Sequence, residues 1–62
     1  SYSEILDKTR QELASSYIKN NSYSITEIAY ILGFTDVSSF TRAFRRWTDC
    51  SPLHYRENLS KN

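Results

Sequence analysis

The stretch "SITEIAYILGFTDVSSFTRAFRRW", residues 24–47, decides the fold. It holds two apolar patterns of helical period, separated by Gly33, the only glycine of the chain. The first pattern predicts a short helix to about Leu32, because Ser24 and Glu27 have the spacing of a capping box at its start. Gly33 is placed to take the left-handed conformation that ends this helix. The apolar face of the helix comprises Ile25, Ile28, Ala29 and Leu32.

The second pattern predicts a helix from Val37 to about Thr48, with Asp36 as its N-cap. Its apolar residues recur at spacings of three, four and three, which is typical of a helix with one buried face. We expect ordinary core packing for these side chains, not stacking on bases. The set consists of Val37, Phe40, Phe44 and Trp47, joined by Phe34 from the turn.

Weaker signals predict one more helix on each side of this pair. A helix over residues 3–19 is expected to begin at the N-cap Ser3 and to end in the polar residues 19–22. The pair Ser51-Pro52 reads as an N-cap followed by a first helical residue, so a last helix is expected over 52–59. The prediction is an all-α fold of about four helices. The expected apolar face of the first helix comprises Leu6, Thr9, Leu13, Ala14 and Tyr17.

Length and composition exclude several classes of protein. At 62 residues the chain is one domain at most, and a domain of this size buries only about 60% of its unfolded surface. One cysteine, Cys50, and one histidine, His54, provide neither an internal disulfide nor a zinc site. No long apolar run or signal-like start is present, so we expect a soluble, cytoplasmic protein without a membrane role. No catalytic constellation, metal cluster or cofactor-binding loop is recognisable, and an enzyme is not expected.

Charge is distributed unevenly, although the formal net charge is only +1. Residues 1–27 hold three cationic side chains against four carboxylates, a balance of −1. Residues 37–56 hold four arginines against one aspartate, a balance of +3. Lys8, Arg10 and Lys19 alternate with acids along the first helix and are interpreted as a solvated face. The concentrated positive segment favours double-stranded DNA as the partner.

The predicted helix pair has the features of a helix-turn-helix over residues 26–48: a short helix, a tight turn, and a second helix with a free polar face. Base contacts in such motifs come mostly from the start of the second helix, so Ser38, Ser39 and Arg42 are predicted to contact base edges. Arg42 can fork onto the two acceptors of guanine. Phosphate contacts are predicted for Arg45 and Arg46 on that helix, and for Ser24 and Thr26 at the start of the preceding one.

Residues 25–56 resemble the second helix-turn-helix motif of the AraC/XylS family of bacterial transcription regulators. The resemblance rests on Ile25, Glu27-Ile28-Ala29, Gly33-Phe34, Ser38, Phe40, Arg42, Phe44-Arg45-Arg46, Ser51-Pro52 and Tyr55-Arg56. Residues 3–19 resemble the long helix that joins the two motifs of this family. The resemblance implies a homeodomain-like, AraC-type fold and sequence-specific DNA binding in transcription regulation, with the helix over 37–48 in a major groove.

Two departures from the family pattern stand out. Asp49 occupies the position after the recognition helix where the family usually has glycine, and we expect aspartate to take the left-handed conformation there with some strain. The first motif of the family is missing, so the chain resembles a fragment of a larger DNA-binding region. The resemblance implies that effector and dimerisation functions lie in a part of the protein that this chain does not include.

Several alternatives stay open at the level of sequence. Tyr30 and Ile31 form an apolar feature on the outer side of the short helix, and are interpreted as a possible contact with the missing motif or with RNA polymerase. The competing class of function is a helical protein-interaction module whose basic face addresses an acidic partner. Arg56 is expected in a structural contact rather than on DNA, and Cys50 as a small filler near a helix end. The resemblance favours an activator. It does not identify the operator, the regulated genes, the effector or the oligomeric state.

Overall fold

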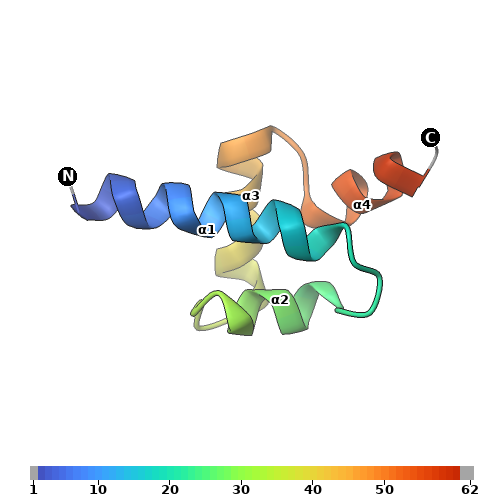
Figure 1. Cartoon of the computed structure of the whole chain (residues 1–62), viewed down its shortest axis with the longest axis horizontal. Coiled ribbons are helices and arrows are strands. Elements are labelled where there is room, and N and C mark those ends of the chain that lie inside the picture. Colours follow the sequence, from blue (N-terminus) through green and yellow to red (C-terminus); the bar gives the residue numbers. More distant parts are fainter. Residues whose placement is uncertain (1, 61–62) are drawn as a thin grey trace.

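A computed structural model describes residues 2–60 of the chain, with the side chains of residues 5–59. Four helices account for most of this part: α1 (Tyr2–Ile18), α2 (Ile25–Ile31), α3 (Val37–Thr48) and α4 (Pro52–Ser60) (Figure 1). The all-α prediction is confirmed, and each observed helix boundary lies within about one residue of the predicted one. The helix α1 begins at Tyr2, before the predicted cap Ser3, whose side chain lies outside the described residues.

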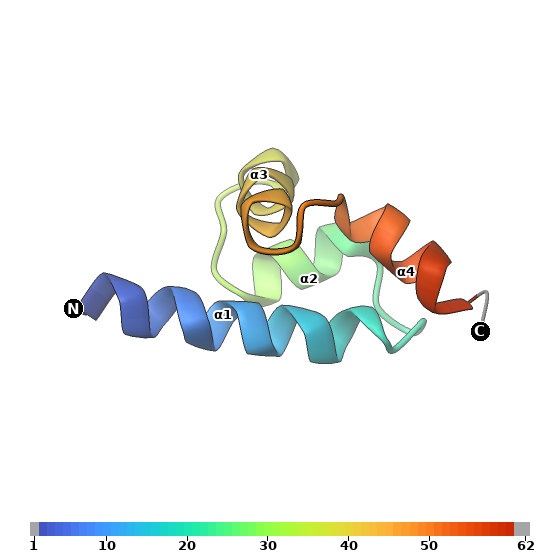
Figure 2. The ribbon, with the colours of Figure 1, turned by 90° about the horizontal axis from the view of Figure 1, so that it is seen from above.

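The helices α2, α3 and α4 lie on one side of the long helix α1, as Figure 2 shows from above. Helix α3 is seen nearly end-on in this view, beyond α2, and α4 lies beside the C-terminal end of α1. The N-terminal turns of α1 extend past the other helices in both views. This overhang gives the domain an elongated outline of 36 × 19 × 17 Å.

Helix α2 is short because its two ends are closed by local hydrogen bonds. At its start the Glu27 amide donates to the Ser24 hydroxyl at 3.1 Å, and the Ser24 amide donates to the Glu27 carboxylate at 2.9 Å, which confirms the capping box. At its end Gly33 has φ +90°, as predicted. The Gly33 amide donates to the carbonyl of Tyr30, and the Phe34 amide to that of Ala29, which is a Schellman motif.

Side chains or backbone conformations at both ends of α3 also fix its length. The Asp36 carboxylate accepts a hydrogen bond from the Ser39 amide at 2.7 Å, so the predicted N-cap is confirmed. Asp49 ends the helix in the left-handed conformation, with φ 66° and ψ 10°, and its amide donates to the Arg45 carbonyl at 2.8 Å. The expected break therefore forms without glycine. The next helix starts where Ser51 accepts from the His54 amide at 3.2 Å.

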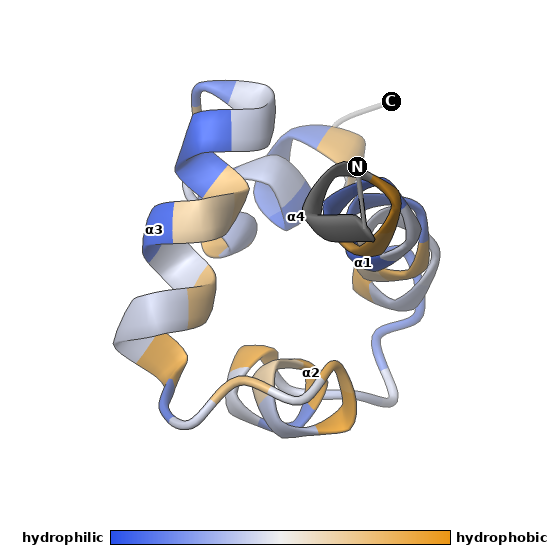
Figure 3. Cartoon of the chain, turned by 90° about the vertical axis from the view of Figure 1, so that its left-hand side faces the viewer, coloured by the Kyte–Doolittle hydropathy of each residue, from blue (hydrophilic) through white to orange (hydrophobic). Residues whose placement is uncertain are grey.

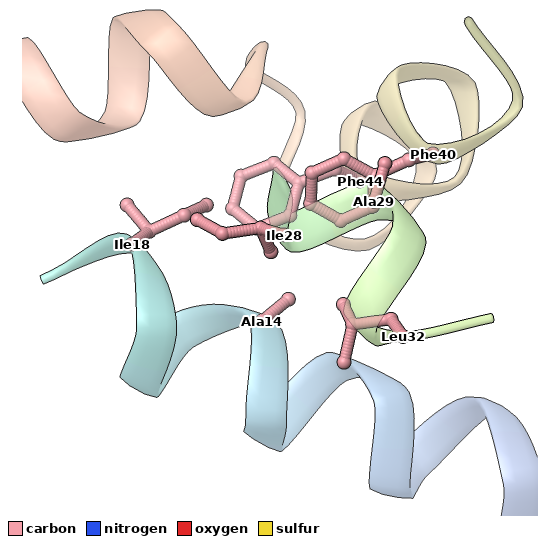
Figure 4. Packing of buried hydrophobic residues seen from close by; sticks show 7 residues of the cluster. All are labelled: Ala14, Ile18, Ile28, Ala29, Leu32, Phe40 and Phe44. Atoms are coloured by element: carbon pink, nitrogen blue, oxygen red, sulfur yellow. The ribbon is translucent and has the colours of Figure 1, made fainter. Parts of the chain in front are cut away.

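The core lies where α1, α2 and α3 meet, and α3 supplies its largest side chains (Figure 4). Phe40 and Phe44 are fully buried, and Val37, Phe34 and Trp47 pack partly against them, so core packing is confirmed for the predicted stripe. Small side chains allow the close approach of the helices. The buried cluster consists of Ala14, Ile18, Ile28, Ala29, Leu32, Phe40 and Phe44.

The predicted inner face of α1 is partly wrong. Leu6 and Leu13 are 37% and 44% exposed, whereas Ala14 and Ile18 are fully buried. Ala14 and Ile18 lie one turn apart on a line that continues back to Arg10. This line faces the core because Ala14 and Ile18 pack in one cluster with Ile28, Ala29 and Leu32 of the α2 segment. The prediction missed Ile18 because Arg10 interrupts the apolar pattern of its line.

Arg56 of α4 closes the C-terminal end of α1. Its Nε donates to the carbonyl of Ile18 at 3.0 Å, and its Nη2 donates to the carbonyl of Asn20 at 3.2 Å. The last carbonyls of a helix have no partner within the helix, and a guanidinium satisfies them while its charge complements the helix dipole. Arg56 thus has the structural contact expected for it and ties α4 to α1.

Replacement of Arg56 by methionine is expected to lower the free energy of unfolding by about 1–3 kcal/mol, because two charge-assisted hydrogen bonds are lost while the apolar stem stays. Urea denaturation of the 62-residue chain measures this change. Lys19→Met removes an exposed cation from the same corner and serves as the control. Equal stability of the two variants would contradict the role of Arg56.

Candidate nucleic-acid interface

Helix α3 exposes a polar face opposite its buried one. Ser38, Arg42, Arg45 and Arg46 are exposed, whereas Phe40, Ala43 and Phe44 of the same helix are buried. Because a residue turns about 100° around a helix, Ser38, Arg42 and Arg45 share one side, with Arg46 at its edge. In Figure 3, where the ribbon is coloured by hydropathy, the most hydrophilic stretch of α3 lies in its second half. Four of the side chains predicted to meet DNA, those of Ser38, Arg42, Arg45 and Arg46, are therefore exposed along this face.

Asp36 and Ser39 organise the start of this face. Ser39 is half-buried, and its amide is held by the Asp36 carboxylate. This hydrogen bond is the main cause that lowers the pKa of Asp36, with a further contribution from the positive charge of Arg42. Ser38 is the more accessible of the two serines predicted to contact bases. A carboxylate thus lies beside the first turn of α3, close enough to Arg42 for their charges to interact.

Arg46 at the other end of the face has a partner on α1. Its Nη2 lies 3.8 Å from Oδ2 of Asp7, and the two side chains are 66% and 49% exposed. An exposed ion pair of this kind contributes about 0–1 kcal/mol. The pair therefore holds Arg46 only weakly. No spacing pattern indicates this pair, because the two residues lie on different helices.

The start of α2 offers less to a phosphate than the sequence suggests. The hydroxyl and the amide of Ser24 are both engaged in the capping box, and Glu27 brings a negative charge to the same place. Thr26 is exposed beside them. Of the two residues predicted there, Thr26 is the one whose side chain does not serve the cap.

The outer side of α2 presents apolar surface. Tyr30 is 58% exposed and Ile31 is 48% exposed, as the sequence predicted. They lie on the short helix, while the arginines lie on α3. A partner could contact these two residues without using the basic face.

One cationic residue of α1 was wrongly assigned to the solvated face. Arg10 is half-buried, and its guanidinium carbon lies 4.7 Å from the centre of the Phe34 ring. Its place on the helical line of Ala14 and Ile18, four and eight residues further on, is the signal that could have indicated an inward position. Lys8 and Lys19 are exposed, as expected.

The described part of the chain contains neither a candidate metal site nor a candidate membrane span. Among the described residues, no group of three or more histidine, cysteine, aspartate or glutamate side chains could hold a metal ion. None of the helices within residues 2–60 has the length and apolar character that crossing a membrane requires. Cys50 is half-buried, with its sulfur 3.7 Å from the Thr48 hydroxyl.

A short helix, a tight turn, and a second helix with an exposed basic face form a helix-turn-helix, the arrangement by which many regulators bind DNA. The family described as "Helix-turn-helix domain" matches residues 1–58. The chain belongs to this family, in its AraC-type form.

Relatives with known names agree with this membership. The chain is 46% identical over 56 residues to the ornithine utilization regulator of Pseudomonas aeruginosa, a match of 90% of this chain and 16% of the relative. The crystal structure of the transcriptional regulator CdpR from the same species matches with a TM-score of 0.88 and 40% identity, over 92% of this chain and 18% of that one.

A DNA-binding transcriptional dual regulator from Escherichia coli K-12 matches with a TM-score of 0.96 and 31% identity, over 100% of this chain and 56% of that one. The chain thus spans less than a fifth of the ornithine utilization regulator and of CdpR, and just over half of the dual regulator.

The lowered pKa of Asp36 predicts a pH-dependent contribution to stability. Because the pKa is lower in the folded than in the unfolded chain, the contribution is present above the usual aspartate pKa and is lost as the pH falls through the folded-state value. Asp36→Asn keeps an efficient N-cap but does not titrate. Thermal melts from neutral to acidic pH should show a smaller acid-induced drop in Tm for this variant. Parallel curves for the two proteins would contradict the prediction.

Proposed function

We propose that this chain binds double-stranded DNA sequence-specifically by placing α3 in a major groove. Arg42, with Ser38 and Ser39, contacts base edges, while Arg45 and Arg46 contact phosphates, and Thr26 and Ser24 add weaker phosphate contacts. The observation that carries the proposal is that α3 has two distinct faces. Phe40 and Phe44 are fully buried on one face, and the arginines are exposed to solvent on the other. The first turns of a recognition helix reach base edges, and later turns pass the backbone.

We infer further that the chain is one half of a two-motif DNA-binding region, with α1 as the helix that joins the halves. The support is its similarity to a regulator chain of which it covers 56%. The overhang of α1 leaves Ile5 and Leu6 exposed at 68% and 37%, on the end of the helix that lies far from α4. Effector binding and dimerisation belong, in this proposal, to other parts of the parent protein.

The proposal has three further parts: action as an activator, a place on DNA in the cytoplasm, and no catalytic role. Membership in a family of regulators supports the last two, and the resemblance described above favours the first. The alternative function, binding of a partner protein, is proposed only for the outer side of α2. There, Tyr30 and Ile31 are proposed to contact RNA polymerase.

Replacement of Arg42 by alanine is expected to remove about 1–3 kcal/mol of discrimination between a preferred duplex and its single-base variants. Arg45→Ala is the matched control: it should weaken binding to every duplex alike and lower the slope of log affinity against log salt by about 1. Fluorescence anisotropy over a salt series measures both quantities. Uniform loss on all sequences for Arg42→Ala would show that this arginine does not read bases.

The contact with RNA polymerase is tested by Tyr30→Ser with Ile31→Ser in the parent regulator. Loss of two apolar contacts should lower activated transcription in vitro by about tenfold, with unchanged operator affinity. Leu53→Ser, at another exposed apolar position, provides the control. Activation at the wild-type level would remove polymerase from the list of partners.

A further inference from the structure

Arg10 connects α1 to the turn of the helix-turn-helix. Its guanidinium carbon lies 4.7 Å from the centroid of the Phe34 ring, within the range of a cation–π contact. A Cβ added to Gly33 would lie 3.6 Å from Arg10 Nη2, so the guanidinium also lies close to the backbone of the turn. The side chain is half-buried, whereas Lys8, the other cationic residue of α1, is exposed. The contact joins residues 24 positions apart in sequence.

Phe34 in turn packs against two aromatic side chains of α3. Its ring centroid lies 5.5 Å from that of Phe40 and 6.5 Å from that of Trp47, both on α3. Two residues after Phe34, Asp36 caps the start of the same helix. Arg10 therefore lies at one end of a row of packed groups that leads to Phe40 in the first turns of α3 and to Trp47 in its last turn.

The C-terminal part of α3 is held by a separate contact. The Phe44 ring packs edge-on against Tyr55 of α4, with the centroids 5.3 Å apart. Loosening the Arg10 contact would shift the start of α3 more than its end, because the Phe44–Tyr55 contact and the Arg46–Asp7 pair also hold the end. The start carries Ser38 and Ser39, which face bases in the proposed complex, and the end carries Arg45 and Arg46, which face phosphates.

We propose that Arg10 is a positioning residue for sequence readout: by stacking on Phe34 it fixes the turn against α1 and so sets the pose of the first turns of α3. The proposal rests on the proposed function, since it concerns how the same helix meets DNA. Arg10 does not contact DNA in this arrangement. It acts on base discrimination more than on general affinity, because long arginine side chains reach phosphates over a range of helix poses.

The test compares Arg10→Met with Lys8→Met in the 62-residue chain. Both remove one positive charge from α1, but Lys8 is exposed. Binding is measured on a duplex that the wild-type chain selects from a randomised pool and on a scrambled duplex of the same composition, at a temperature where circular dichroism shows every variant folded. Arg10→Met should lower the ratio of the two affinities by about 3- to 10-fold. Lys8→Met should leave the ratio within about twofold, since a lost distant charge affects both duplexes alike.

Trp47, the only tryptophan, reports the same contact without DNA. Its emission and its quenching by acrylamide should change in Arg10→Met and stay unchanged in Lys8→Met, because Trp47 packs on the ring that Arg10 covers. Phe34→Leu removes the other partner. If the two side chains act through one contact, the double variant should lose no more discrimination than the worse single variant.

Each outcome separates this proposal from the proposed function. A wild-type preference that survives in Arg10→Met, or an equal loss in Lys8→Met, overturns the role of Arg10 and leaves DNA binding by α3 intact. A wild-type chain that selects no sequence overturns sequence readout itself, and the role of Arg10 with it. If Arg10→Met does not fold, Arg10→Gln, which also lacks the charge that stacks on Phe34, takes its place, and a wild-type ratio with wild-type Trp47 emission in that variant overturns the proposal.

Discussion

The packing of Phe40 and Phe44 into the space between α1 and α2 is the constraint on which the other features depend. Both rings are fully buried, and they meet Ile18 and Ile28 in the same cluster. Loss of one such ring costs about 3–5 kcal/mol, which is a large part of the 5–15 kcal/mol that holds a typical domain together. Because one side of α3 packs into the core, Ser38 and the three arginines on its other side are exposed to solvent. Core and interface are two sides of one helix.

Local signals predicted the middle of the chain well. The capping box, the glycine turn and the Asp36 cap each depend on residues no more than five positions apart, so the sequence shows all of the participants together. The inner face of α1 depends on which side α2 packs against. Two helical lines of α1 carried apolar residues, and the line with fewer of them, through Ala14 and Ile18, is the buried one.

Contacts between distant residues account for the rest. Arg56 binds the carbonyls of Ile18 and Asn20, 38 and 36 positions away, and no spacing rule connects them. From the sequence Arg10 was predicted to lie on a solvated face, but in the structure its guanidinium packs on the ring of Phe34. The exposure of the interface residues followed from periodicity, whereas the pairing of Arg46 with Asp7 required the angle between α1 and α3. The surroundings of long charged side chains are the hardest to predict from sequence. Such a side chain can extend into solvent or can contact a remote carbonyl, carboxylate or aromatic ring.

Asp49 bears on how such a regulator can adapt. It is the one residue other than glycine with a positive φ in the described part of the chain, and this conformation is strained for a side chain with a Cβ. The strain lies just past the end of α3, after the residues that face bases and phosphates in the proposed complex. Glycine at this position would relieve the strain without altering any side chain that is proposed to contact DNA.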